Sequence, residues 1–299
     1  MAEHRGRKPT RSWAELVPPV CAGVLIVATL AVIVFIAERG LATFLVHGVS
    51  PREFFFSTLW KPDRPPEAGG PALGALPFII GSVLVTGLAV LLAAPLSIMT
   101  AFFIVEIAPS AGRRIIQPAV EILAGIPSVV YGWVGLSVIV VFIREHFGGL
   151  GFSVLAGGLV LAVMIVPTIV SVATEAVRSF PPEAKEAALA LGSTRWQMLR
   201  WVVFPAVLPG LITAVILGMA RAFGEALAVQ MVIGNTHTVP RSLLDQTITL
   251  TSGITLDMGY TVMGTAWNNA LWTMALVLLI ISLFFIVLSR TIAKRGVLR

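Results

Sequence analysis

Residues 206–234 read AVLPGLITAVILGMARAFGEALAVQMVIG, an apolar run long enough to cross a bilayer as a helix. Two ionisable side chains, Arg221 and Glu225, interrupt this run beyond its midpoint. A charge at the centre of a lipid-facing helix costs about 2.5–3.5 kcal/mol on insertion scales. We therefore expect both side chains to face protein or water, which is typical of an ion or substrate pathway.

The composition of the chain indicates an all-α integral membrane protein. Hydrophobic residues make up 57% and charged residues 12% of the 299 residues, and the mean hydropathy is +0.93. A soluble domain carries about twice that charged fraction. Six apolar segments are long enough to span a membrane, which predicts six transmembrane helices. They cover residues 17–37, 74–105, 115–143, 152–174, 206–234 and 266–289.

The distribution of basic residues predicts the orientation in the membrane. With the N-terminus inside, fourteen of the 21 Lys and Arg residues fall in cytoplasmic segments and six in outer loops. This bias follows the positive-inside rule, so both termini are expected in the cytoplasm. The net charge of +6 then reflects topology, and no nucleic-acid partner is expected. The expected divisions are a cytoplasmic tail over 1–16, a first helix over 17–37, a periplasmic loop over 38–73, a membrane core over 74–289 and a cytoplasmic tail over 290–299.

Two outer loops are expected to differ in structure. The loop over 38–73 contains aromatic residues that fit either an interfacial belt or a small cap, and we favour a cap. These residues are Phe54, Phe55, Phe56 and Trp60. The loop over 235–265 has too few consecutive apolar residues to span, so a re-entrant or interfacial path is expected. His237 within it is interpreted as an ordinary polar loop residue.

The third apolar segment contains a proline and a stripe of small and polar residues. Pro127 removes a backbone hydrogen bond and is expected to kink the helix. The stripe fits a close-packing face, or a pathway lining in which the hydroxyls of Ser128 and Tyr131 bind an anion. Its members are Glu121, Gly125, Ser128, Gly132 and Gly135, with Tyr131 beside them. Both interpretations hold if this helix packs against a partner that forms the pore.

The polar segment over 175–205 predicts a helix–turn–helix unit, here called the knob. Pro181-Pro182 favours a helix start, and residues 183–192 contain strong helix formers. Gly192 fits a helix C-terminal cap, and Thr194-x-x-Gln197 has capping-box spacing that opens a second helix. The alanine-rich surface would allow another protein to approach closely. The alternative is a solvated connecting loop.

The knob also contains Glu186-Ala187-Ala188, then Gly192, then Val202-x-Phe204-Pro205. This pattern resembles the EAA loop of ABC-importer membrane subunits, although Val202 and Phe204 stand where isoleucine and leucine are usual. The resemblance implies that Glu186, Ala187, Ala188 and Gly192 belong to a coupling helix that sits in a cleft of a cytoplasmic ATPase.

Three further stretches narrow this resemblance. They are GALPFIIGSVLVT over 74–86, EILAGIPSVVYG over 121–132 and ARAFGEALAVQMVIGN over 220–235. They resemble the phosphate-specific importer permeases, and the long loop before Gly74 resembles the PstC type more than its PstA-type partner. The resemblance covers about residues 50–299 and implies a type I ABC importer permease fold in the cytoplasmic (inner) membrane of a bacterium. The implied partners are a PstA-like permease, a dimer of ATP-binding subunits, a periplasmic phosphate-binding protein, phosphate and membrane lipid.

Arg221 is the only basic residue inside a predicted span, so it is the first choice for a phosphate-binding donor. Glu225 is expected one turn further along the same helix face. There it would orient the guanidinium, screen it so that phosphate is released, or pair with an arginine of a partner subunit. A purely structural ion pair is the alternative. Ala214, Gly218 and Ala228 share that face, which places the expected site between two subunits.

The chain is not expected to be catalytic. It contains no G-x-x-x-x-G-K-[ST] motif, so no cofactor is expected and ATP would be hydrolysed by the partner subunit. The four histidines are scattered, so no metal site is predicted. The remaining alternatives are a permease for another oxyanion such as sulfate or molybdate, a PstA-type subunit, or an autonomous channel or scaffold.

Overall fold

The computed structural model describes residues 13–65, 67 and 69–297, so most of the predicted N-terminal tail lies outside the described residues. Within these residues, six helices are long and apolar enough to cross a membrane, which confirms the predicted number. They run over Val17–Leu45, Leu76–Ile107, Ser128–Phe147, Val154–Arg178, Arg195–Phe223 and Ala266–Ala293. The third and fifth spans differ from their predicted bounds, because the helix breaks after Gly125 in one and after Phe223 in the other.

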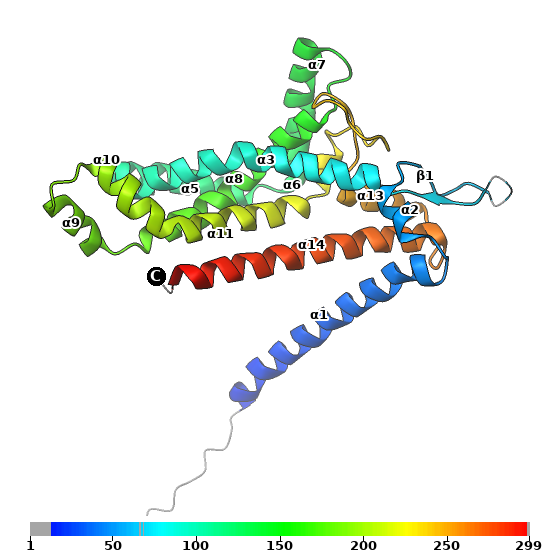
Figure 1. The fold of residues 1–299 in the computed structure, drawn as a ribbon, viewed down its shortest axis with the longest axis horizontal. Helices are drawn as coiled ribbons and strands as arrows, with labels where there is room; N and C mark the ends of the chain where they lie inside the picture. Colours follow the sequence, from blue (N-terminus) through cyan, green and yellow to red (C-terminus); the bar gives the residue numbers. More distant parts are fainter. Residues whose placement is uncertain (1–12, 66, 68, 298–299) are drawn as a thin grey trace, which may run out of the picture.

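Three helices form the centre of the molecule: α3 (Leu76–Phe102), α8 (Val154–Arg178) and α11 (Phe204–Phe223). The helix α8 lies between the other two and is the most buried span, because it packs against both. Much of this packing is apolar, with Leu161, Ile165 and Ile169 fully buried. The last helix, α14 (Ala266–Val297), packs along α11 over much of the length of the molecule (Figure 1).

The first helix, α1 (Trp13–Leu45), packs mainly against α14 and diverges from the rest of the molecule toward its N-terminal end (Figure 1). The Thr43 and Thr273 hydroxyls lie 2.7 Å apart and join the two helices where they meet. The helix continues eight residues beyond the predicted end at residue 37. Arg39 therefore lies inside a candidate span, and the prediction that Arg221 is the only such basic residue was wrong.

A compact cap covers the end of the molecule opposite the knob (Figure 1). It comprises α2 (Pro51–Phe56), the antiparallel pair β1 (Trp60–Lys61) and β2 (Ala72–Leu73), and α13 (Leu250–Asp257) with η6 (Met258–Tyr260). Phe54 is fully buried and Trp60 is 6% exposed, and the Trp60 indole donates to Asp257 Oδ2 at 3.1 Å. A cap is present as predicted, and its packing on the membrane surface stays a prediction. The belt interpretation was wrong for these two residues, because they pack against protein.

The knob has the predicted local structure. The helix α9 (Pro182–Ala190) begins at Pro182, and Gly192 follows it with a φ of +86°, as a C-terminal cap requires. The predicted capping box is present, since Thr194 N–H donates to Gln197 Oε1 at 2.8 Å and Gln197 N–H to Thr194 Oγ1 at 3.2 Å. The second helix then runs without a break through α10 (Arg195–Gln197), the π-helical η5 (Met198–Val203) and α11. The fifth span thus begins at Arg195, earlier than predicted.

Between α3 and α8 the chain passes through a series of short helical segments. In chain order they are η2 (Phe103–Ile107), α4 (Pro109–Ala111), η3 (Gly112–Ile116), α5 (Gln117–Gly125), α6 (Ser128–Val134), η4 (Gly135–Val140) and α7 (Val141–Phe147).

The docking of α13 on α3 depends on a glycine. A Cβ built at Gly81 would collide with the carbonyl oxygen of Ile248, whereas a Cβ at Gly87 on the same helix would meet nothing within 4 Å. We expect Gly81→Ala to lower the free energy of unfolding by about 2 kcal/mol, because overpacking forces the backbone to shift. Thermal unfolding in detergent would measure this, with Gly87→Ala as the matched control. Equal melting temperatures for the two variants would contradict the prediction.

Candidate functional site

The fifth span ends at Phe223, and this overturns the predicted relation between Arg221 and Glu225. The chain turns at Gly224 and resumes as the short helix α12 (Leu227–Gln230), so the span predicted over 206–234 is not one continuous helix. Glu225 Oε1 accepts from Ala228 N–H at 3.2 Å, and Thr251 Oγ1 donates to the Glu225 carbonyl at 2.8 Å. These side chains replace helix hydrogen bonds, which allows the break within an apolar segment.

A second break interrupts the third predicted span. The helix α5 ends at Gly125 and α6 begins at Ser128, with Ile126 and Pro127 extended between them. The predicted kink is thus a full break, and the candidate span begins at Ser128 and not at residue 115. The Tyr131 hydroxyl donates to the Leu123 carbonyl across this break at 2.7 Å. Tyr131 therefore compensates for backbone hydrogen bonds that the break removes.

The two breaks are joined by close packing of α6 against α12. A Cβ built at Gly132 would lie 2.9 Å from Ala228 Cα and 2.8 Å from Met231 Sδ. Glycine at this position lets the two backbones approach, which confirms the close-packing interpretation there. Glu121 lies outside this contact, since it is exposed and accepts from Gln117 Nε2 at 3.1 Å. The predicted single stripe is therefore divided by the break.

Arg221 lies in the last turn of α11 and is exposed. Its Nη1 donates to Thr168 Oγ1 of α8 at 2.7 Å. A cation at a helix C-terminus is favoured by the helix dipole. Among the described residues the one ion pair joins Lys185 to Glu106, so Arg221 and Glu225 form no ion pair. The interpretation of a structural Arg221–Glu225 pair within this chain was wrong.

All three small residues predicted to face a second subunit are covered by this chain. Ala214 and Gly218 are buried, and a Cβ built at Gly218 would lie 2.5 Å from Ile169 Cγ1 of α8. Ala228 is buried against α6, because the break redirects the chain after Phe223. The prediction that these small residues face a second subunit was therefore wrong: Gly218 and Arg221 both meet α8 of this chain, and Ala228 lies beyond the break. Arg221 itself remains accessible.

Ser128 stands at the start of α6, half-buried, and its hydroxyl makes no hydrogen bond to another described residue. Arg221 precedes the break between α11 and α12, whereas Ser128 and Tyr131 follow the break between α5 and α6. The two broken segments meet where α12 packs against α6. Thr168, the partner of Arg221, was not predicted. Its contact joins residues 53 positions apart on different helices, and no local pattern could have indicated it.

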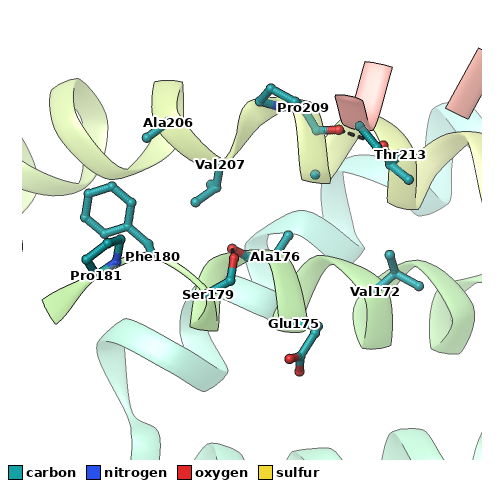
Figure 2. Close-up of a pocket in the computed structure, with 12 residues that line it drawn as sticks. Val172, Glu175, Ala176, Ser179, Phe180, Pro181, Ala206, Val207, Pro209 and Thr213 are labelled. Carbon is teal, nitrogen blue, oxygen red and sulfur yellow. Dashed lines mark hydrogen bonds between the residues drawn. The ribbon is translucent and has the colours of Figure 1, made fainter. Parts of the chain in front are cut away.

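A cavity of about 460 Å³ lies between α8 and α11 near the knob. Figure 2 shows Phe180 and Pro181 opposite Ala206 and Val207, with Glu175 directed away from α11. Its twelve lining residues include no Lys, Arg or His. Without a cationic donor this cavity does not fit an anion site, in contrast to the surroundings of Arg221.

The predicted coupling residues differ in exposure. Glu186 and Ala187 are exposed on α9, whereas Ala188 is half-buried and packs against the central core. Gly192 has no heavy atom within 4 Å of a built Cβ. The surface that α9 presents to solvent is therefore centred on Glu186 and Ala187.

His237, in the loop over 235–265, is more constrained than predicted, since its ring lies 5.3 Å from the ring of Phe78. Burial lowers the pKa of the His237 imidazole, and the Asp257 carboxylate partly opposes this effect. The neutral imidazole of His237 therefore predominates at pH 7.

The hydrogen bond across the second break can be tested with the two tyrosines of the chain. We expect Tyr131→Phe to lower the free energy of unfolding by about 1 kcal/mol, because it leaves the Leu123 carbonyl without this donor. Tyr260→Phe serves as the control, since Tyr260 is 82% exposed and its hydroxyl makes no hydrogen bond to another described residue. Thermal melting in detergent would distinguish them. A melting temperature unchanged in Tyr131→Phe would contradict the role given to this hydroxyl.

Comparisons with known proteins agree with this architecture. The family described as "Binding-protein-dependent transport system inner membrane component" matches residues 93–296. The "Probable ABC transporter permease protein YqgH" of Bacillus subtilis is 52% identical over 296 residues, which cover 99% of this chain and 94% of that protein. The "Phosphate transport system permease protein PstC" of Haemophilus influenzae is 35% identical over 257 residues, which cover 79% of each protein.

Solved structures share the fold. A chain of the bacterial alginate ABC transporter aligns with a TM-score of 0.58 at 17% identity, covering 95% of this chain and 99% of that chain. A chain of the MetNI methionine ABC transporter aligns with a TM-score of 0.53 at 20% identity, covering 73% and 94%. The predicted type I ABC importer permease fold is confirmed.

These matches account for the six apolar helices. A permease subunit of this kind is a multi-pass protein of the inner membrane and is not itself catalytic. Because the family match covers well over half of the sequence, the chain belongs to the binding-protein-dependent transport system inner membrane components, the permease family of ABC transporters.

Proposed function

We propose that this chain is a membrane subunit of an ATP-driven importer that carries inorganic phosphate across the cytoplasmic membrane. The observation that carries the proposal is the exposed guanidinium of Arg221, which lies at a helix break and is held by a single threonine. Relatives named PstC that are about one-third identical over most of this chain support phosphate as the substrate.

The arrangement suits a tetrahedral oxyanion. The Glu225 carboxylate is engaged by the Ala228 N–H and does not neutralise Arg221, so the guanidinium keeps donors for an anion. The hydroxyl of Ser128 would be a further donor, and the Tyr131 oxygen would contribute polarity. Both residues lie at the break between α5 and α6. A partner permease would complete the site from the side on which Arg221 is exposed.

Energy would enter through the knob. In this proposal two ATP-binding subunits hydrolyse ATP, a PstA-like permease forms the second half of the pathway, and a periplasmic phosphate-binding protein delivers the substrate. Both termini lie in the cytoplasm, and this chain binds no cofactor. Closure of the ATPase dimer would move α9 and change which side of the membrane reaches Arg221.

Uptake of labelled phosphate by a transporter-deficient strain that expresses the complete complex tests this function. We expect ATP-dependent uptake that unlabelled phosphate suppresses and excess sulfate or molybdate leaves largely intact. Full suppression by sulfate or molybdate would assign the complex to another oxyanion. Conduction of phosphate by the isolated chain in liposomes without ATP would make it a channel.

A further inference from the structure

The helix α9 is held to the membrane helices by few contacts. It contains no buried residue, and its apolar contact with the core is made by the half-buried Ala188. Among the described residues, one side-chain hydrogen bond joins α9 to a membrane helix: Lys185 Nζ donates to Glu106 Oε1 at 2.5 Å. This is also the one ion pair in the described part of the chain.

The placement of these two charges is unfavourable for each helix alone. Lys185 is the fourth residue of α9, near the positive end of that helix dipole. Glu106 is the penultimate residue of η2, which continues α3, and so lies near a negative end. Neither charge stabilises its own helix, and pairing the two charges offsets both unfavourable interactions with the helix dipoles. The position of the pair is thus explained by the contact between α9 and α3.

The ion pair is also better shielded than a typical surface pair. The Lys185 and Glu106 side chains are 20% and 10% exposed. Lys185 Nζ also lies 5.8 Å from the centre of the Phe180 ring. Partial burial strengthens the attraction between two charges and makes loss of one partner more costly than at the surface.

The helix α3 connects this pair to the elements around Arg221. At the opposite end of the molecule, Ser82 Oγ of α3 accepts from the N–H of Leu250, at the start of α13. The next residue, Thr251, donates to the carbonyl of Glu225 in the α11–α12 break. Hydrogen bonds therefore link α9 to the end of η2, which continues α3, then α3 to α13, and α13 to the break that follows Arg221. Figure 1 shows α3 running between the knob and the cap.

We propose that the Lys185–Glu106 ion pair is the tie through which movement of α9 is transmitted to α3. This inference rests on the proposed function, because it requires α9 to be moved by a partner ATPase. Lys185 and Glu106 are then positioning residues: they do not touch the transported ion, and their loss separates ATP hydrolysis from transport.

The complete transporter in proteoliposomes provides the first test, with phosphate transported per ATP hydrolysed as the readout. Lys185→Met and Glu106→Gln are each expected to lower this ratio about fivefold while the ATPase still co-purifies. The exchange Lys185→Glu with Glu106→Lys should restore it to within about twofold, since the pair is re-formed. Glu145→Gln is the matched control, because Glu145 is an exposed acid of α7, outside the knob, without an ion-pair partner in the described residues.

A second measurement does not depend on which ion is transported. Spin labels at Leu191, which is 90% exposed beside α9, and at Val83, which is 53% exposed on α3, report the distance between these helices after Cys21→Ser. Addition of ATP should leave this distance unchanged in the transporter with the intact pair and shift it in Lys185→Met. The proposed role of the ion pair would be contradicted if ATP had the same effect on this distance in the unaltered transporter and in Lys185→Met. It would also be contradicted if Lys185→Met and Glu106→Gln both kept a normal ratio of phosphate transported to ATP hydrolysed. Lack of phosphate uptake by the unaltered complex would instead overturn the proposed function.

Discussion

Arg221→Ala is expected to lower phosphate uptake by about 10- to 100-fold, because it removes charge-assisted hydrogen bonds to the anion that are each worth about 1.5–3 kcal/mol. The structure makes this variant informative. The guanidinium is exposed, forms no ion pair with another described residue and contacts Thr168 alone by a hydrogen bond, so its removal leaves no buried charge behind. Initial rates of labelled phosphate uptake would measure the loss.

Arg221→Lys separates charge from geometry. Lysine keeps the positive charge but lacks the planar fork, and we expect about a tenfold loss of uptake. Arg144→Ala is the matched control, because Arg144 also lies exposed in the last turn of a helix, α7, away from the two breaks. Thr168→Val removes the intramolecular partner of Arg221 and should affect uptake less than either Arg221 variant. Near-normal uptake by both Arg221 variants would assign this arginine to structure.

Ala187→Trp is expected to reduce uptake by about tenfold or more through loss of ATPase docking. Ala187 is exposed on α9, and an indole there would hold any docked surface away from the helix. Overpacking of a close contact costs about 1–3 kcal/mol. The measurement is the amount of ATP-binding subunit that co-purifies with the permease, compared with uptake by the same cells.

The control for added bulk is Ala28→Trp, which places the same side chain on the exposed surface of α1, far along the chain from α9. It should leave co-purification of the ATPase unchanged. If Ala187→Trp retained both the ATPase and full uptake, α9 would not be the docking surface. The amount of permease in the membrane is measured in the same samples, because a variant that fails to assemble would lower uptake through loss of the permease itself.

Local patterns predicted local structure well. The capping box of Thr194 and Gln197 and the C-terminal cap at Gly192 depend on residues a few positions apart, so their spacing was sufficient. The number of spans followed from hydropathy, since each span must be apolar over a fixed length. The environment of the buried cap residues Phe54 and Trp60 was harder to predict, because aromatic residues also suit a membrane interface.

The candidate site was predicted in part. The selection of Arg221 rested on its charge within an apolar run, and the structure leaves it exposed, with a hydrogen bond to Thr168. The relation to Glu225 was wrong, because helical periodicity was extended across Gly224, where the helix ends. Nothing in residues 206–234 indicates that Thr251 satisfies the Glu225 carbonyl, and without such a partner the break would be unfavourable in a membrane.

The sequence by itself determined the membrane location, the number of spans, the knob and the arginine that we assign to the anion. These properties arise from composition, from length and from contacts between near neighbours. Only the tertiary structure decided where the third and fifth helices break, which small residues are already covered, and that Lys185 meets Glu106. Each of these depends on groups far apart in the chain, whose hydrogen bonds and packing become possible only when the helices are assembled.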